Sequence, residues 1–262
     1  TVPAGATSID LRLSFSPERV GPFSNKLTIT LFDPNGFRGE GHRGGALHEA
    51  HVACDGATPG YLPGRLPAGE WTVRINAQAA LQSEPLLTYT LQVAVSSAAA
   101  GDRPVLWAPP PERVLARQAG WFRGELHSHT NHSDGHWTLH EMWQRGRELG
   151  LDFICLTDHN TITAIAEIAA LPHERPLVIP GLEITSFRGH ALALGVTRWV
   201  DWYTNRGERG GADWMREVYD AGGVFAIAHP FTVGDPACTG CRPPAGARTP
   251  RAYPVPGARP AV

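Results

Sequence analysis

Apolar and polar residues alternate along the first part of the chain. The alternation is clearest at residues 9–15, and it recurs at 27–31, 71–75 and 87–95. A period of two predicts half-buried β-strands, and the Gly- and Pro-containing turns between these segments favour antiparallel pairing. Because hardly any helical pattern occurs here, we expect an antiparallel β-sandwich domain over residues 1–100.

Glycine-rich sequence without clear alternation occupies the middle of this region. It contains three histidines, His42, His48 and His51. We expect loops here, and we interpret the three histidines as surface residues.

The pattern changes towards residue 120. Ala/Ser-rich sequence and a proline run predict a linker at 101–119, with the boundary of the second domain between Ser97 and Gly120. The strands expected beyond it cover residues 121–126, 153–156, 177–179, 191–196 and 224–228, and the expected helices cover 138–149, 162–171 and 213–221. Repeated strand–helix units favour parallel pairing, so we expect an α/β layer or barrel over 120–241.

Polar residues stand directly beside several of these strands. Parallel α/β folds collect their active sites where the strands end, because the loops there converge on one rim. The residues that follow the strands are His127, His129, Asp158, His159, Glu183 and His229, and His190 precedes a further strand. We therefore expect these side chains to meet at one edge of the fold.

The residue types point to divalent metal ions. His127 and His129 lie two apart on an extended strand, so their imidazoles face the same way and can hold one ion. Glu183 ends a buried strand, which is costly for a charge unless it is paired or metal-bound, and a glutamate there can bridge two ions. Asp134 is either a turn residue or a ligand, and Asp158 is either a ligand or a support for a ligand or a water.

The candidate set contains imidazoles and carboxylates but no obvious thiolate. Such ligands suit zinc, manganese or iron, and the sequence does not choose among them. A divalent ion in such a site generates hydroxide from water at neutral pH, so no Ser or Cys nucleophile is required. The remaining histidines are expected to be surface or helix residues: His132, His136, His140 and His173.

Composition and charge exclude some functions. The chain has 262 residues and a formal net charge of -2, which argues against a broad surface for nucleic acid or anionic membranes. No apolar run approaches the ~20 residues of a membrane-spanning helix, and no signal peptide is visible, so the localisation stays open. Cys155 is expected in the core, Cys54 has no evident partner, and Cys238 and Cys241 form either a local disulfide or two free thiols.

Six motifs, taken in order, resemble the PHP (polymerase and histidinol phosphatase) family. They are Glu125-Leu126-His127-Ser128-His129, Ser133-Asp134-Gly135, Thr157-Asp158-His159-Asn160, Gly181-Leu182-Glu183, Gly189-His190 and Ala228-His229-Pro230. The resemblance covers residues 120–230. It implies a distorted seven-stranded β/α barrel that binds two or three divalent ions and acts as a hydrolase, usually of phosphoesters.

The resemblance also implies how the ligands divide among the ions. The implied groups are His127, His129 and Glu183 for a first ion, Glu183, His190 and His229 for a second, and Asp134 and His159 for a third. The β-rich N-terminal domain and the stretch Cys238-Thr239-Gly240-Cys241 further resemble the branch that includes carbaryl hydrolase, in which esters or carbamates are cleaved.

The chain departs from the family near its C-terminal end. The family's last motif, Asp-x-His, is missing after Pro230, and residues 242–262 are rich in Pro, Arg and Ala. This composition predicts a disordered tail, which is either a frameshift or truncation near Arg242 or a natural extension. The barrel would then be incomplete. Because the first and third ions would each lose one ligand, we expect weakened metal binding and low activity.

The leading functional hypothesis is a metal-dependent hydrolase that cleaves phosphoesters of a small-molecule substrate by a metal-activated water, with no nucleic-acid or membrane partner. One alternative is hydrolysis of carbamates, esters or amides on the same architecture. Another is an inactive truncated form with only a binding role.

Overall fold

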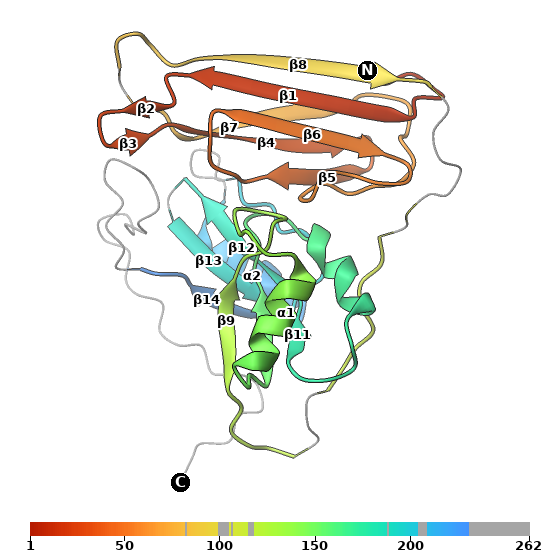
Figure 1. The fold of residues 1–262 in the computed structure, drawn as a ribbon, viewed down its shortest axis with the longest axis vertical. Coiled ribbons are helices and arrows are strands. Elements are labelled where there is room, and N and C mark those ends of the chain that lie inside the picture. The colour runs from red at the N-terminus through yellow and green to blue at the C-terminus, as the bar shows by residue number, and fades with distance from the viewer. Residues whose placement is uncertain are drawn as a thin grey trace.

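The computed structural model describes residues 1–81, 83–98, 105, 107–114, 118–187, 189–203 and 209–230. The predicted tail at 242–262 and the pair Cys238 and Cys241 lie outside the described residues. Figure 1 shows a layered β-structure stacked on a second group of sheets and helices. Among the helices in these ranges, none is long and apolar enough to cross a membrane.

Two antiparallel sheets form the N-terminal sandwich. One has the strand order β6-β1-β8 and the other β5-β4-β7. Their strands are β1 (Ser8–Ser16), β4 (Lys26–Asp33), β5 (Gly36–Gly41), β6 (Leu47–Ala53), β7 (Thr72–Ala79) and β8 (Thr88–Ser96), and a hairpin is formed by β2 (Arg19–Val20) and β3 (Phe23–Ser24). The antiparallel pairing predicted for this region is confirmed.

The alternation in the sequence places one side of each sheet in a shared core. Leu11 and Leu13 on β1 and Ile29 and Leu31 on β4 are all 2% exposed or less. They belong to one cluster of buried apolar side chains, so the two sheets pack face to face. Removing this apolar surface from water is the main term that stabilises the sandwich.

Strands β5 and β6 correct the prediction of loops in the glycine-rich middle. β5 carries glycine where another segment crosses it closely. A Cβ at Gly39 would lie 2.4 Å from the Cα of Tyr61, and Gly39 has a φ of +143°. Glycine is therefore required at this crossing, and the missing side chains hide the strand from a pattern of apolar and polar positions.

Two separate three-stranded sheets follow. In the first, β9 (Gly124–Ser128), β10 (Phe153–Leu156) and β11 (Leu177–Ile179) pair in parallel, as predicted. In the second, β12 (Gly181–Ser186), β13 (Gly189–Leu194) and β14 (Val224–Ile227) pair antiparallel. Side chains from both sheets, including Leu156, Leu182 and Ala193, share one buried cluster.

The second sheet corrects the prediction of parallel pairing throughout this region. Only two residues separate β12 from β13, which is too short for the crossover that a parallel pair needs. Within the ranges described above no sheet closes on itself, so the barrel part of the predicted α/β fold is not confirmed.

Three helical segments accompany these sheets. Thr138 caps the start of helix α1 (Leu139–Glu148): its hydroxyl accepts a hydrogen bond from the Glu141 N–H, and the Glu141 carboxylate accepts one from the Thr138 N–H. Helix α2 (Gly211–Asp220) lies near its predicted position. The segment predicted as an α-helix at 162–171 is instead a 3₁₀ helix, η1 (Thr163–Ala170), and no side-chain hydrogen bond caps its start.

The β5-β4-β7 sheet of the N-terminal sandwich makes aromatic and polar contacts with the sheets and helices that follow in the chain. The ring of Phe37 stacks on Trp199, with the ring centroids 4.7 Å apart. Trp202 is fully buried and donates its indole N–H to Glu40 Oε2 at 2.9 Å. Through these contacts β5 is the strand of the sandwich that packs against the segment containing Trp199 and Trp202.

Removal of a buried side chain should test the sandwich core. We expect Leu13→Ala to lower the free energy of unfolding by about 2–5 kcal/mol, because it removes apolar contacts and leaves a cavity. Urea unfolding measures the change. The control is Leu86→Ala, since Leu86 is 68% exposed; its effect should stay within about 0.5 kcal/mol. Equal effects of the two substitutions would contradict this core.

Candidate metal centre

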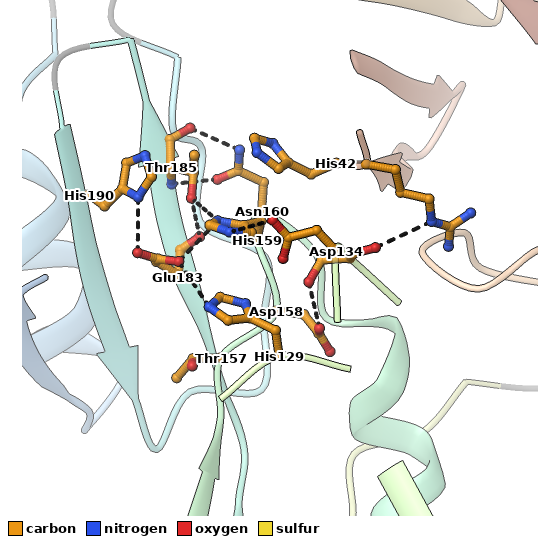
Figure 2. A network of polar contacts seen from close by, with 12 residues as sticks. His42, His129, Asp134, Thr157, Asp158, His159, Asn160, Glu183, Thr185 and His190 are labelled. Atoms are coloured by element: carbon orange, nitrogen blue, oxygen red, sulfur yellow. Dashed lines mark hydrogen bonds and ion pairs between the residues drawn. The ribbon is translucent and has the colours of Figure 1, made fainter. Parts of the chain in front are cut away.

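The structure brings together all seven residues that the sequence analysis selected as ligands. Five strands and one loop supply them. They are His127 in β9, His129 directly after it, Asp134 in the following loop, His159 after β10, Glu183 in β12, His190 in β13 and His229 after β14. Figure 2 shows five of these side chains, those of His129, Asp134, His159, Glu183 and His190, directed toward a common region.

Backbone pairing places His159 beside Glu183. After β10 ends, the chain runs parallel to β12 and forms an isolated bridge between these two residues. The Glu183 N–H donates to the Asp158 carbonyl at 3.1 Å, and the Asn160 N–H donates to the Glu183 carbonyl at 2.9 Å. Asn160 has a φ of +54°, a left-handed conformation that asparagine tolerates better than most residues. The two sheets are thereby joined at the site.

The Glu183 carboxylate is the centre of the cluster. It is 0% exposed, and five imidazoles surround it. Its Oε2 atom lies 3.1 Å from His127 Nε2, 3.4 Å from His129 Nε2 and 2.9 Å from His159 Nδ1. Its Oε1 atom lies 3.0 Å from His190 Nδ1 and 3.1 Å from His229 Nε2. The two oxygens therefore face two different sets of imidazoles.

Several of the facing atoms have no hydrogen bond. Within the described ranges, Glu183 Oε2 and His127 Nε2 are buried without a hydrogen-bond partner, although they lie only 3.1 Å apart. His129 Nδ1, the ring nitrogen other than the one that lies 3.4 Å from Glu183 Oε2, also has no hydrogen-bond partner in these ranges. Buried polar atoms are normally paired, and nitrogen and oxygen acceptors that converge on one buried point are what a cation requires. The donor set therefore fits divalent metal ions.

Three groups of side chains have ligand atoms close enough to share an ion. Within each group these atoms lie within 4.8 Å of one another. The groups are His127, Glu183 and His229; His129, His159 and Glu183; and His42, Asp134 and His159. Imidazole and carboxylate together suit zinc, manganese or iron.

The charges in the cluster depend on His159. Burial disfavours its protonation, but hydrogen bonds and charge from Asp134 and Glu183 outweigh burial and raise its pKa to about 9. Burial also opposes ionisation of Asp134, yet His159, at 3.4 Å, lowers the pKa of that carboxyl to about 2. Burial and the charge of His159 lower the pKa of His129 to about 4. In the metal-free protein a protonated His159 thus balances part of the carboxylate charge.

Asp158 supports the loop that carries Asp134. Its buried carboxylate accepts hydrogen bonds from the Thr130 N–H, the Thr130 hydroxyl and the Ser133 hydroxyl, each at 2.7 Å. Three donors from one loop occupy this carboxylate. The geometry therefore favours a supporting role for Asp158 over the role of ligand, and the group it supports is the loop and not an imidazole ring.

The structure corrects the surface placement of three histidines. His42 is 3%, His48 8% and His132 7% exposed. His48 stacks on Phe15, and His132 Nδ1 lies 2.7 Å from the hydroxyl of Thr163. Their partners come from distant segments, so local sequence could not show the burial. The other histidines expected at the surface are exposed, namely His51, His136, His140 and His173.

Comparison with known protein families gives an independent result. Residues 125–203 match the PHP domain. This PHP segment contains six of the seven clustered residues, and His229 follows it. Neither the curated proteins nor the solved structures yield a match to the chain. The match and the three ligand groups support a hydrolase-type function that depends on metal, while the resemblance to the carbaryl hydrolase branch gains no support from them.

Loss of the Asp158 carboxylate should destabilise the site loop. We expect Asp158→Ala to lower the free energy of unfolding by about 3 kcal/mol, because it leaves the buried donors of Thr130 and Ser133 unpaired. Thermal or urea unfolding of the metal-free protein measures this. In the control, Asp10→Ala, an exposed pair with His51 is lost, and we expect a change of about 0–1 kcal/mol. A comparable small loss for Asp158→Ala would refute the supporting role.

Proposed function

We propose that the protein is a metal-dependent hydrolase that cleaves phosphoesters. The observation that carries this proposal is the convergence of five imidazoles on the buried Glu183 carboxylate. A structural zinc site normally closes with four ligands, usually including thiolates. Here the donors exceed what one ion needs and include no thiolate among the described ligands. The PHP match supports the same class of function.

Glu183 is suited to bridge two ions. Its Oε2 faces His127, His129 and His159, and its Oε1 faces His190 and His229. The Oε1 side matches the second ligand group implied by the family resemblance, whereas the close ligand atoms pair His127 with His229 and His129 with His159. When bound in such a site, divalent ions supply a hydroxide nucleophile at neutral pH and neutralise charge on the group that is cleaved.

Neighbouring residues orient the ligands. His159 Nδ1 lies 2.5 Å from the Thr185 hydroxyl. The Asn160 side chain accepts a hydrogen bond from the Thr185 N–H at 2.7 Å and donates one to the Thr185 carbonyl at 2.9 Å. Such supporting contacts hold a metal ligand in one orientation and lower the cost of binding.

The charge of the site favours an anionic substrate. The three ligand groups contain only two carboxylates, those of Glu183 and Asp134. Imidazole ligands bind as neutral bases, so two divalent ions would leave the site with a net positive charge. A positively charged site attracts anions, which favours a phosphoester over a neutral ester or carbamate.

Metal content tests the role of Glu183. We expect the full chain, equilibrated with Mn²⁺ or Zn²⁺, to bind about two or more ions per chain, with the lowered affinity that the missing Asp-x-His motif predicts. Glu183→Gln should lose most of them, because a neutral amide is a poor bridge between two cations. Mass spectrometry of the metals gives the ratio, and Glu49→Gln, on an exposed side chain, should match the wild type. A wild-type chain that retains no ion would sink the proposed function.

A matched substrate panel tests the bond that is cleaved. We expect kcat/KM for an aryl phosphoester to exceed that for an aryl carbamate with the same leaving group by about tenfold or more, because of the site's positive charge. A chelator should abolish the activity. A faster carbamate would instead favour carbamate or ester hydrolysis, and no turnover with metal bound would indicate a binding role.

Metal affinity should fall as the pH is lowered. Protons compete with the ion for imidazole nitrogens, and because burial of His159 is outweighed by Asp134 and Glu183, which raise its pKa to about 9, this competition is already present at neutral pH. We therefore expect the Kd for Mn²⁺ or Zn²⁺ to rise steadily between about pH 8 and pH 5.5 in calorimetric titrations. A Kd independent of pH over this range would argue against imidazole ligands.

A further inference from the structure

His42 reaches the metal centre from the N-terminal sandwich. It directly follows β5 and is 3% exposed. Its ring lies on that of His159, with centroids 4.4 Å apart, and one of its nitrogens lies within 4.8 Å of ligand atoms of both Asp134 and His159. Figure 2 shows the His42 side chain entering this group from the sandwich.

The His42 ring has an unmatched polar atom. Its Nδ1 is buried and has no hydrogen-bond partner in the described part of the chain, and Glu40 Oε1 lies 3.8 Å away. A buried histidine that only fills a core normally pairs its nitrogens with a donor or an acceptor. The ring instead lies beside the imidazole of His159, tilted by 30° to it, and close to the Asp134 carboxylate, so the three side chains can share one ion.

Glu40, two residues before His42, fixes the position of His159. The Glu40 carboxylate is 0% exposed and accepts hydrogen bonds from Trp202 Nε1 at 2.9 Å and Asn160 Nδ2 at 3.1 Å. Asn160 follows His159 in the chain. The strand end that carries His42 therefore holds the turn that carries its neighbour in the cluster.

Arg43, the residue after His42, fixes the loop of Asp134. It donates hydrogen bonds to the Asn131 carbonyl at 2.9 Å and to the Ser133 carbonyl at 3.3 Å. Both flanks of His42 are thus tied to the two segments whose side chains it approaches. Such bracing is needed for a ligand supplied across an interface, because metal coordination tolerates little error in distance.

We propose that His42 is a ligand of a third ion, together with Asp134 and His159, so that the metal centre is built by both parts of the chain. This inference rests on the proposed function, since it requires a metal centre to exist. The N-terminal sandwich then acts as part of the catalytic body and not as a separate binding module.

Metal stoichiometry of matched variants tests the proposal. In the full chain loaded with Mn²⁺ or Zn²⁺, His42→Gln should hold about one ion fewer than the wild type, because a glutamine amide is a weak ligand for these ions. The control is His48→Gln, another buried histidine of the same sandwich, which should hold as many ions as the wild type. Circular dichroism confirms that each variant is folded.

The outcomes separate this inference from the proposed function. If His42→Gln binds as many ions as the wild type, with the same affinity, His42 is not a ligand, while the two-ion hydrolase stands. If the wild type binds no metal ions, both the proposed function and the inference about His42 are wrong. A measurement on the wild type needs no variant: anomalous diffraction from the Mn²⁺- or Zn²⁺-loaded chain should show an ion within about 2.0–2.3 Å of a His42 nitrogen. An ion cluster without density there would overturn the proposal.

Discussion

The organisation of the molecule depends on one buried negative charge. Glu183 has no exposed surface, and a carboxylate in such a place is costly unless positive charge or hydrogen-bond donors surround it. Strands from a parallel and an antiparallel sheet end around it, and each delivers imidazole nitrogens to one of its oxygens. The contacts with His127, His159 and His190 more than offset burial and hold the pKa of Glu183 far below its usual range. The fold therefore keeps an anion at the centre of the candidate metal site.

A buried carboxylate also organises the contact between the N-terminal sandwich and the rest of the chain. Glu40 is a second fully buried carboxylate, and burial raises its pKa to about 7 in spite of hydrogen bonds from Thr30, Asn160 and Trp202. Its donors come from both parts of the chain, so satisfying this one group aligns β5 with the turn after β10. The Glu40 carboxylate thus helps to position the turn that lies beside Glu183.

Much of the site could be predicted from sequence because its signals are local. The spacing of two between His127 and His129 on a strand predicts that their side chains face the same way. The charge of Glu183 within an apolar stretch indicates that it is paired or metal-bound. His42 could not be predicted, since its relation to Asp134 and His159 exists only after two distant segments pack. β5 was hidden by the glycines that permit this packing, and the antiparallel β12 and β13 were missed although the short connection between them leaves no room for a crossover. Local patterns thus recover candidate ligands and many of the strands but not the contacts between sheets.

The bond between Glu40 and Asn160 joins residues 120 positions apart. During synthesis the N-terminal sandwich emerges first, when neither Asn160 nor Trp202 yet exists. Until they follow, Glu40 must remain hydrated or protonated, and the face of Phe37 that later stacks on Trp199 stays open to water. The nascent sandwich consequently exposes this face to water until the rest of the polypeptide has been made and has packed against it.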